Sequence, residues 1–159
     1  MPKVELDVRT TVPPEVVRAA LLNFSERRPD IWPGIEPSLY RVYAIGPTTA
    51  EIQEGSKMPG GGVWARERYD WSNPDEIRWT VVESNFCAPG SYVSAAIRPA
   101  PDGSGSLVHV VWNRTATTLQ GQIAATLIRF TRGAPVAASF RMAMKRLESE
   151  SSPQTSGQH

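Results

Sequence analysis

Six segments between residues 37 and 117 are rich in valine, isoleucine, tyrosine, tryptophan and threonine, and short turns separate them. Such residues favour strands, whereas the glycines and prolines in the turns interrupt regular structure. Connections this short join strands that are neighbours and run in opposite directions. The sequence therefore predicts an antiparallel meander. The expected strands are residues 37–45, 49–56, 63–71, 76–85, 91–99 and 106–117.

A further strand and two short helices are expected before this meander. Residues 4–12 alternate apolar and charged side chains, which is the period of a strand with one face in water. Pro13 and Pro14 end that strand and suit the first turn of a helix. The first helix is expected to bury Val16, Val17, Ala20, Leu21 and Phe24. The second is expected to follow Ser25, a plausible N-cap, and to end at residues 32–34.

The chain changes to a helical period in residues 119–148. Pro135 lies inside this stretch, removes a backbone donor and is expected to kink the helix. The apolar residues expected on its buried face are Ile123, Leu127, Phe130, Val136, Phe140, Met144 and Leu147. Residues 149–159 are polar, and we expect a disordered tail there. The sequence thus predicts one domain over residues 1–148, followed by this tail.

The order of elements predicts an α+β domain in which a curved, seven-stranded antiparallel sheet wraps around the long kinked C-terminal helix. The N-terminal segment resembles the start of START-type domains of the SRPBCC superfamily, and reads VELDVRTTVPPEVVRAALLNFSERRPDIWPGI. The later segments YDWSNP, IRWTVVESN, LVHVVWNRTAT and LQGQIAATL agree with that superfamily in order and spacing. The nearest named group is the polyketide cyclase/dehydrase and lipid-transport group. The resemblance extends over residues 3–147.

This resemblance implies a helix-grip fold with an internal cavity between the sheet and the long helix. Members of the superfamily hold sterols, lipids, polyketides, plant hormones or other apolar molecules there. The first functional hypothesis is therefore binding of a small, mostly apolar molecule, such as a lipid or polyketide. The second is an enzyme that resembles polyketide cyclases and dehydratases. The third is a protein-interaction module similar to the chaperone-activating members of the superfamily.

Strand alternation predicts which side chains face such a cavity, since residues i and i+2 share a face. In residues 91–99 either face is consistent with the pattern, and we place Tyr92 inward. Arg66, Arg68 and Arg114 fall on the opposite faces and are expected outside. The side chains expected to line the cavity are Glu67, Tyr69, Trp71, Trp79, Val81, Glu83, Tyr92, His109, Val111 and Asn113 from the sheet, with Ile123, Leu127 and Phe130 from the helix.

Charged and polar residues among these aromatic side chains are the strongest chemical signal in the sequence, because a buried carboxylate is costly unless it is paired or protonated. In the functional interpretation, Glu83 and His109 transfer protons or orient a ligand. In the structural alternative, Glu67 or Glu83 lies at a strand end and pairs with an arginine, and His109 is a hydrogen-bonded core residue. The sequence leaves both interpretations open.

Composition argues against several other classes of function. The 17 lysines and arginines nearly balance the 16 acidic residues, and a net charge of +1 does not attract nucleic acid. One cysteine and two histidines argue against a metal centre, and no cofactor motif is found. The sequence shows neither a signal peptide nor an apolar run long enough for stable membrane insertion, so we expect a cytoplasmic protein. The resemblance implies a monomer or homodimer.

Overall fold

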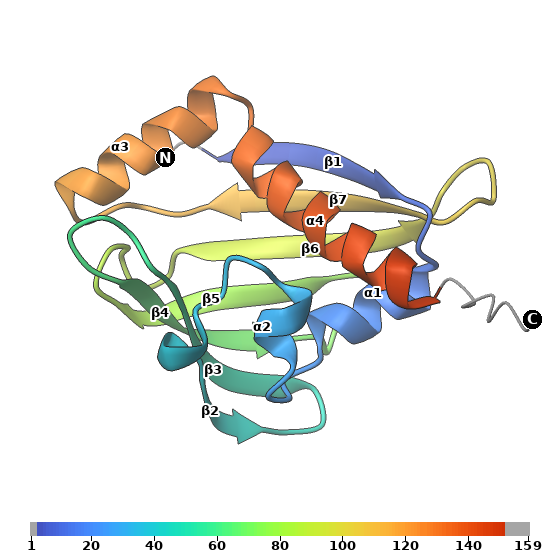
Figure 1. Ribbon diagram of the computed structural model, residues 1–159, viewed down its shortest axis with the longest axis horizontal. Coiled ribbons are helices and arrows are strands. Elements are labelled where there is room, and N and C mark those ends of the chain that lie inside the picture. The colour runs from blue at the N-terminus through green and yellow to red at the C-terminus, as the bar shows by residue number, and fades with distance from the viewer. Residues whose placement is uncertain (1–2, 152–159) are drawn as a thin grey trace, which may run out of the picture.

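The computed structural model describes residues 3–151 and contains one antiparallel sheet with helices on one side of it (Figure 1). The strands are β1 (Val4–Thr10), β2 (Arg41–Ile45), β3 (Thr49–Ser56), β4 (Val63–Asp70), β5 (Ile77–Ser84), β6 (Tyr92–Pro99) and β7 (Ser106–Asn113). The helices are α1 (Pro14–Leu21), α2 (Arg28–Ile31), the 3-10 turn η1 (Pro37–Leu39), α3 (Leu119–Phe130) and α4 (Ala134–Ser151).

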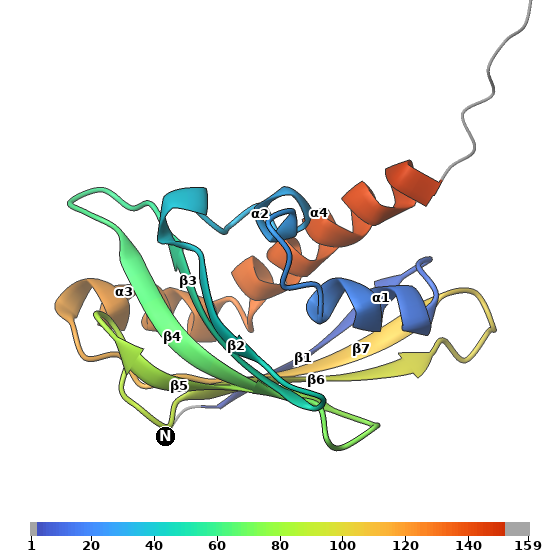
Figure 2. The same ribbon diagram turned by 90° about the horizontal axis from the view of Figure 1, so that it is seen from below.

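The strand order across the sheet is β1-β7-β6-β5-β4-β3-β2. The six later strands therefore form the predicted meander, and β1 pairs with β7 along the far edge. Figure 2 shows that the sheet is curved and that α1, α2 and α4 lie over its concave side. The predicted fold class, with two short helices after the first strand and a long C-terminal helix over the sheet, is confirmed.

The ends of two strands differ from the prediction. Residues 37–39 form the turn η1 instead of the start of a strand, and β2 begins at Arg41. The last strand ends at Asn113, and beyond it only Ala116 forms an isolated bridge, with Cys87. The first change shortens β2 to five residues, and this edge strand is exposed along its whole length.

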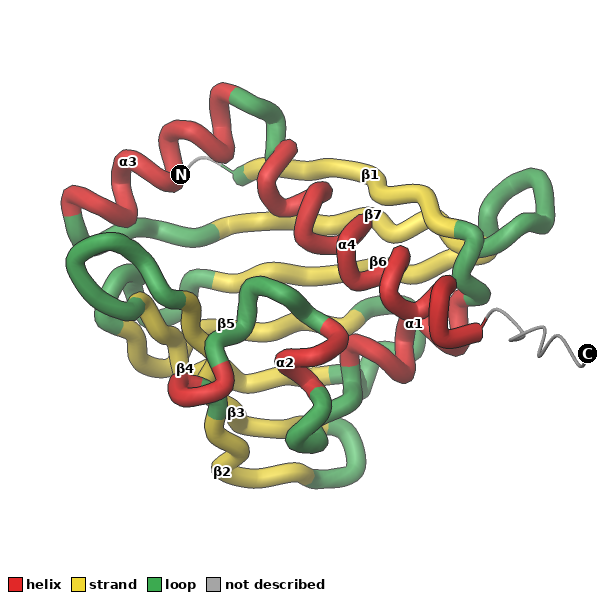
Figure 3. The backbone as a smooth tube through the Cα atoms, in the orientation of Figure 1, coloured by secondary structure: helices red, strands yellow, loops and turns green. Residues whose placement is uncertain are grey.

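The hydrophobic core lies between the concave face of the sheet and the helices. Val17, Ala20 and Leu21 of α1 are buried, whereas Val16, which we expected in the same face, is 38% exposed. α4 contributes Ala137, Phe140, Ala143 and Met144. The tube in Figure 3 shows α4 crossing the strands. Within residues 3–151 no helix is both long and apolar enough to cross a membrane.

The prediction of a kink at Pro135 is wrong, because the helix ends before that residue and a second helix begins. α3 ends at Phe130, and Arg132 and Gly133 adopt positive φ angles of 53° and 79°. A Cβ at position 133 would lie 2.7 Å from the Cδ2 atom of Leu6, so this close approach requires glycine. Pro135 instead lies in the first turn of α4, where it blocks no helical hydrogen bond.

The last helix extends into the segment expected to be a tail. α4 continues to Ser151, so residues 149–151 are helical. The remaining part of the expected tail, residues 152–159, lies outside the described residues.

Candidate functional site

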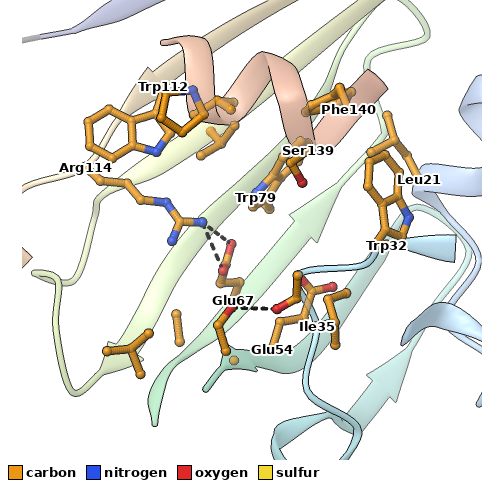
Figure 4. Close-up of a pocket in the computed structure, with 18 of the residues that line it drawn as sticks. Leu21, Trp32, Ile35, Glu54, Glu67, Trp79, Trp112, Arg114, Ser139 and Phe140 are labelled. Atoms are coloured by element: carbon orange, nitrogen blue, oxygen red, sulfur yellow. Dashed lines mark hydrogen bonds and ion pairs between the residues drawn. The ribbon is translucent and has the colours of Figure 1, made fainter. Parts of the chain in front are cut away.

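The main cavity lies between the concave face of the sheet and α4 and has a volume of about 400 Å³. Small-molecule sites in proteins have volumes of this order. Most of the wall is apolar and aromatic, as Figure 4 shows. The apolar residues around it include Leu21, Trp32, Ile35, Trp79, Val93, Trp112, Val136 and Phe140.

Arg28, Glu54 and Tyr69 form a polar cluster on one side of the cavity. The Arg28 side chain is only 2% exposed, and each of its nitrogens has a partner. Its Nε donates to Glu54, its Nη2 donates to the Tyr69 hydroxyl at 3.0 Å, and its Nη1 donates to the carbonyl oxygens of Leu21 and Asn23 at 2.8 and 2.9 Å. The Tyr69 hydroxyl lies 3.2 Å from both Glu54 carboxylate oxygens, so the cluster is closed on itself.

The electrostatics of this cluster favour a permanently charged Arg28. Burial alone would lower the pKa of Arg28, but the Glu54 carboxylate and Tyr69 outweigh it, and the pKa is raised above its usual value. Burial, together with the Glu54 carboxylate, raises the pKa of Tyr69 well above its usual value. Tyr69 therefore remains a neutral hydrogen-bond donor and acceptor.

A second polar pair, Glu67 and Arg114, also lines the cavity (Figure 4). The Arg114 Nη2 lies 3.1 and 3.2 Å from the two Glu67 carboxylate oxygens. The Glu67 side chain is 3% exposed, and Arg114 is 15% exposed. The buried Nε of Arg114 has no hydrogen-bond partner among residues 3–151. The hydrogen bonding of Arg114, which lines the cavity, is thus incomplete among the described residues.

The protonation of Glu67 is balanced near neutral pH. Burial raises the pKa of the Glu67 carboxyl and the Arg114 cation opposes this, with a net value of about 7. Burial would lower the pKa of Arg114, but Glu67 keeps it above its usual value. Glu67 can therefore either accept or donate a proton at neutral pH, while Arg114 remains a cation.

A smaller cavity of about 150 Å³ lies beneath α3. It shares Val63, Phe86, Trp112, Arg114 and Ile128 with the main cavity. Arg114 therefore borders both spaces.

Comparison with solved structures gives the fold family. The similarity to a protein from Thermus thermophilus extends over 95% of this chain and 100% of that protein, with a TM-score of 0.75 and 18% sequence identity. The Zhui aromatase/cyclase from Streptomyces sp. R1128 has a TM-score of 0.72 at 13% identity, covering 94% of this chain and 98% of its own. A START superfamily protein from Mycobacterium smegmatis has a TM-score of 0.66 at 12% identity, and the similarity covers 93% of this chain and 98% of that protein.

The chain has the helix-grip fold of START/SRPBCC proteins. No family model matches its sequence, and no curated protein is detectably similar to it in sequence. At identities below 20%, the similarity to solved structures establishes the fold of this chain. It does not identify the ligand or the reaction.

Five of the expected cavity residues face the interior of the helix-grip domain. Glu67, Tyr69 and Trp79 line the main cavity. Val81 is buried in a small cluster with Ala65 and Cys87, and Trp71 packs against the core with its ring centroid 6.0 Å from that of Phe24. Neither Val81 nor Trp71 borders the cavity. A ligand-binding role for these residues stays a prediction.

The inward orientation expected of Glu83 is wrong. Glu67 pairs with Val81 and Arg66 with Glu83, so β5 carries one extra residue, a bulge at Val82. An extra residue reverses the faces of the side chains that follow it. Glu83 is consequently exposed and lies opposite Arg66 on the outer face.

The faces expected for β7 are also inverted. Val4 pairs with Trp112 and Leu6 with Val110, so Trp112 turns inward. His109 is instead exposed on the outer face, where its Nδ1 lies 2.9 Å from the Asp7 carboxylate. Val111 and Asn113 share this outer face and are only partly buried. Glu83 and His109 therefore do not meet in the cavity as an acid and base.

Tyr92 lies on the outer face as well. The Arg78 guanidinium is 4.4 Å from the centre of the Tyr92 ring, and Tyr92 pairs with Asn113 across the β6–β7 ladder. The alternative face carries Val93 and Ala95, which are buried, and Val93 lines the cavity. The expectation for this strand is wrong because both faces carry small or apolar residues.

The helix residues expected in the cavity, Ile123, Leu127 and Phe130, are exposed. α3 turns its opposite face inward, and Ile128 lines both cavities. The stretch before residue 131 does not continue the axis of α4, because the chain breaks at residues 131–133. The expected face is wrong because α3 also carries apolar residues on the opposite face, and its period alone does not indicate which of the two is buried.

Sequence reasoning did not identify Arg28, Glu54, Trp112 or Arg114. A signal for Glu54 was present, because Ala50, Ile52 and Glu54 alternate along β3 and therefore share the inner face. No local signal indicates that Arg28 is buried. Among residues 3–151, no group of three or more His, Cys, Asp or Glu side chains is placed to hold a metal ion.

Proposed function

We propose that this protein binds a small, mostly apolar molecule in the main cavity, and that the molecule carries an oxygen acceptor for Arg114. The observation that supports this most directly is the Arg114 cation, which lines a mostly apolar cavity and whose Nε has no hydrogen-bond partner among the described residues. A buried cation with incomplete hydrogen bonding costs free energy, and a hydrogen bond from its guanidinium to a ligand oxygen would lower that cost.

The fold and the volume of the cavity support the same proposal. Helix-grip domains typically bind hydrophobic ligands, and the solved structures of this fold include an aromatase/cyclase and a START superfamily protein. A volume of about 400 Å³ suits a ligand of a few fused rings or a short chain. Trp79, Trp112 and Phe140 would contact the apolar part of that ligand.

A second candidate is an enzyme of the cyclase or dehydratase type, and the pKa of Glu67 favours it. A general acid or base works best when its pKa is near the working pH, and the pKa of Glu67 is about 7. In this mechanism Glu67 takes a proton from a carbon next to a carbonyl group. Arg114 stabilises the enolate oxygen, and Glu67 then returns the proton to the leaving hydroxyl group.

The experiment uses native mass spectrometry and a fluorescent probe. Native and denaturing spectra of the purified protein reveal any small molecule that copurifies with it. Anilinonaphthalene sulfonate, which combines apolar rings with anionic oxygens, serves as the probe for titration. We expect saturable binding of one probe molecule per chain, and about tenfold weaker binding for Arg114→Gln, because a hydrogen bond to a charged group is lost.

A pair of adjacent substitutions on α4 provides the control. Ser139 lines the cavity, whereas Ala138 is exposed. Ser139→Trp should fill the cavity and abolish probe binding, and Ala138→Trp should leave it unchanged. If both tryptophan variants bind the probe as the wild type does, the proposed site is wrong. Conversion of a copurifying molecule by the wild type, but not by Glu67→Gln, would favour the enzyme over the carrier.

A further inference from the structure

α3 is apolar on two opposite faces. Ala124, Ala125 and Ile128 line the smaller cavity on its inner side. Its outer apolar face consists of Leu119, Ile123, Leu127 and Phe130, which are 75%, 56%, 58% and 84% exposed. At 100° per residue these four side chains fall within an arc of about 80°. None of the 12 residues of α3 is buried.

An apolar face of a helix normally packs against another apolar surface. Figures 1 and 2 both show α3 at one end of the molecule, beside the loop between β3 and β4. The Gln120 Nε2 donates to the carbonyl oxygen of Pro59 in that loop, at 3.3 Å. No element among residues 3–151 buries the outer apolar face, so it is available to an external surface.

The charges near α3 indicate what kind of surface fits. Arg129 and Arg132 are exposed beside the outer apolar face. The Lys57 side chain, at the start of the neighbouring loop, is 78% exposed and its Nζ lies 3.6 Å from the Glu36 carboxylate. The sequence contains no aspartate or glutamate between residues 103 and 147. An apolar helix face whose own helix and flanking segments carry cations and no carboxylate matches a lipid surface with anionic headgroups.

The same charges argue against a second copy of this chain as the occupant. In a two-fold symmetric dimer, each patch meets its own counterpart. Arg129 and Arg132 would then approach the same arginines of the partner, with no carboxylate from α3 or its flanking segments to neutralise them. We therefore propose that the outer apolar face of α3 docks this protein on the surface of a bilayer that contains anionic lipids.

Vesicle flotation tests this proposal. The wild type is mixed with vesicles of phosphatidylcholine alone, or of equal parts phosphatidylcholine and phosphatidylglycerol. We expect flotation with the mixed vesicles, and much less with phosphatidylcholine alone or at high salt. Arg129→Gln should reduce partitioning about fivefold, because one basic residue near an anionic surface contributes about that factor.

Substitutions at matched exposure identify the surface that docks. Leu127 on α3 and Ile45 on the edge strand β2 are 58% and 60% exposed. Leu127→Glu should lose at least tenfold in vesicle binding, whereas Ile45→Glu should bind like the wild type. Circular dichroism should show both variants folded, since neither position is buried.

Three outcomes would overturn the proposal: no flotation of the wild type with either vesicle, equal losses in Leu127→Glu and Ile45→Glu, or a dimer that Leu127→Glu dissociates. The last outcome would assign the outer apolar face to a second copy. The cavity variant Ser139→Trp separates this proposal from the proposed ligand site. It should still bind vesicles, so failure of probe binding and failure of vesicle docking are distinguishable.

Discussion

The cavity contains two arginine–glutamate pairs that differ in how completely they are hydrogen-bonded. Arg28 uses all three of its nitrogens, on Glu54, Tyr69 and two backbone carbonyls. Arg114 contacts Glu67 through one nitrogen, and its Nε has no partner among residues 3–151. Every nitrogen of Arg28 therefore has a partner, whereas among the described residues the open pair has one nitrogen without a partner and a carboxyl that changes its charge near neutral pH. We interpret the first as a structural anchor and the second as the reactive part of the site.

The largest expected effect is on the anchor. Arg28→Met leaves the Glu54 carboxylate and two carbonyl oxygens without their cation, and we expect a loss of about 3–5 kcal/mol in the free energy of unfolding. Urea denaturation followed by circular dichroism measures it. Arg27→Met is the matched control, because the Arg27 side chain is 68% exposed and its ion pair among residues 3–151 is with Glu150, at 3.5 Å. Equal stability of the two variants would refute the role of Arg28 as an anchor.

Glu67 should make the stability of the protein depend on pH. Its pKa is about 7 in the folded protein and about 4.5 in the unfolded chain, so the folded state binds the proton more tightly. Stability conferred by this group is therefore fully present below pH 4.5 and decreases as the pH rises to about 7. The complete change is about 3–4 kcal/mol.

Comparison with Glu67→Gln isolates this contribution from the other titrating groups. Unfolding free energies of both proteins are measured at about pH 5 and about pH 8. We expect the wild type to lose more stability than Glu67→Gln over this interval. Parallel pH profiles would mean that Glu67 has an ordinary pKa, and the comparison of the two pairs would lose its electrostatic basis.

Removal of the cation from the open pair should cost less than removal of Arg28. Without Arg114, Glu67 can take up a proton and avoid a buried charge. We expect Arg114→Met to cost about 1–2 kcal/mol at about pH 8, and less at about pH 5. Denaturation at both pH values checks this expectation. A cost as large as that of Arg28→Met, and independent of pH, would show that both pairs are anchors.

Most of the fold could be predicted because its signals are local. Alternation along residues 49–56 and the turns on either side predict β3 with the bounds that the structure has. The same alternation places Glu67 and Tyr69 correctly, because Arg66 and Arg68 identify the other face of β4 as the one in contact with solvent. Short connections then give the order of the strands.

The rest of the site could not be predicted because long-range pairing determines it. Both faces of β7 carry apolar residues, so its alternation is ambiguous by itself. Pairing with β1, about a hundred residues away, turns Trp112 inward and places His109 beside Asp7. The burial of Arg28 likewise depends on the carbonyls of Leu21 and Asn23, and an arginine is rarely buried otherwise.

The smallest expected effect is at the two residues that the sequence nominated as acid and base. His109 and Glu83 are exposed on the outer face, and a surface pair such as His109–Asp7 contributes less than about 1 kcal/mol. His109→Ala and Glu83→Gln should therefore unfold within about 1 kcal/mol of the wild type, and should bind anilinonaphthalene sulfonate with unchanged affinity. A tenfold loss of probe affinity in either variant would connect the outer face to the cavity. It would also show that the open Glu67–Arg114 pair does not act alone.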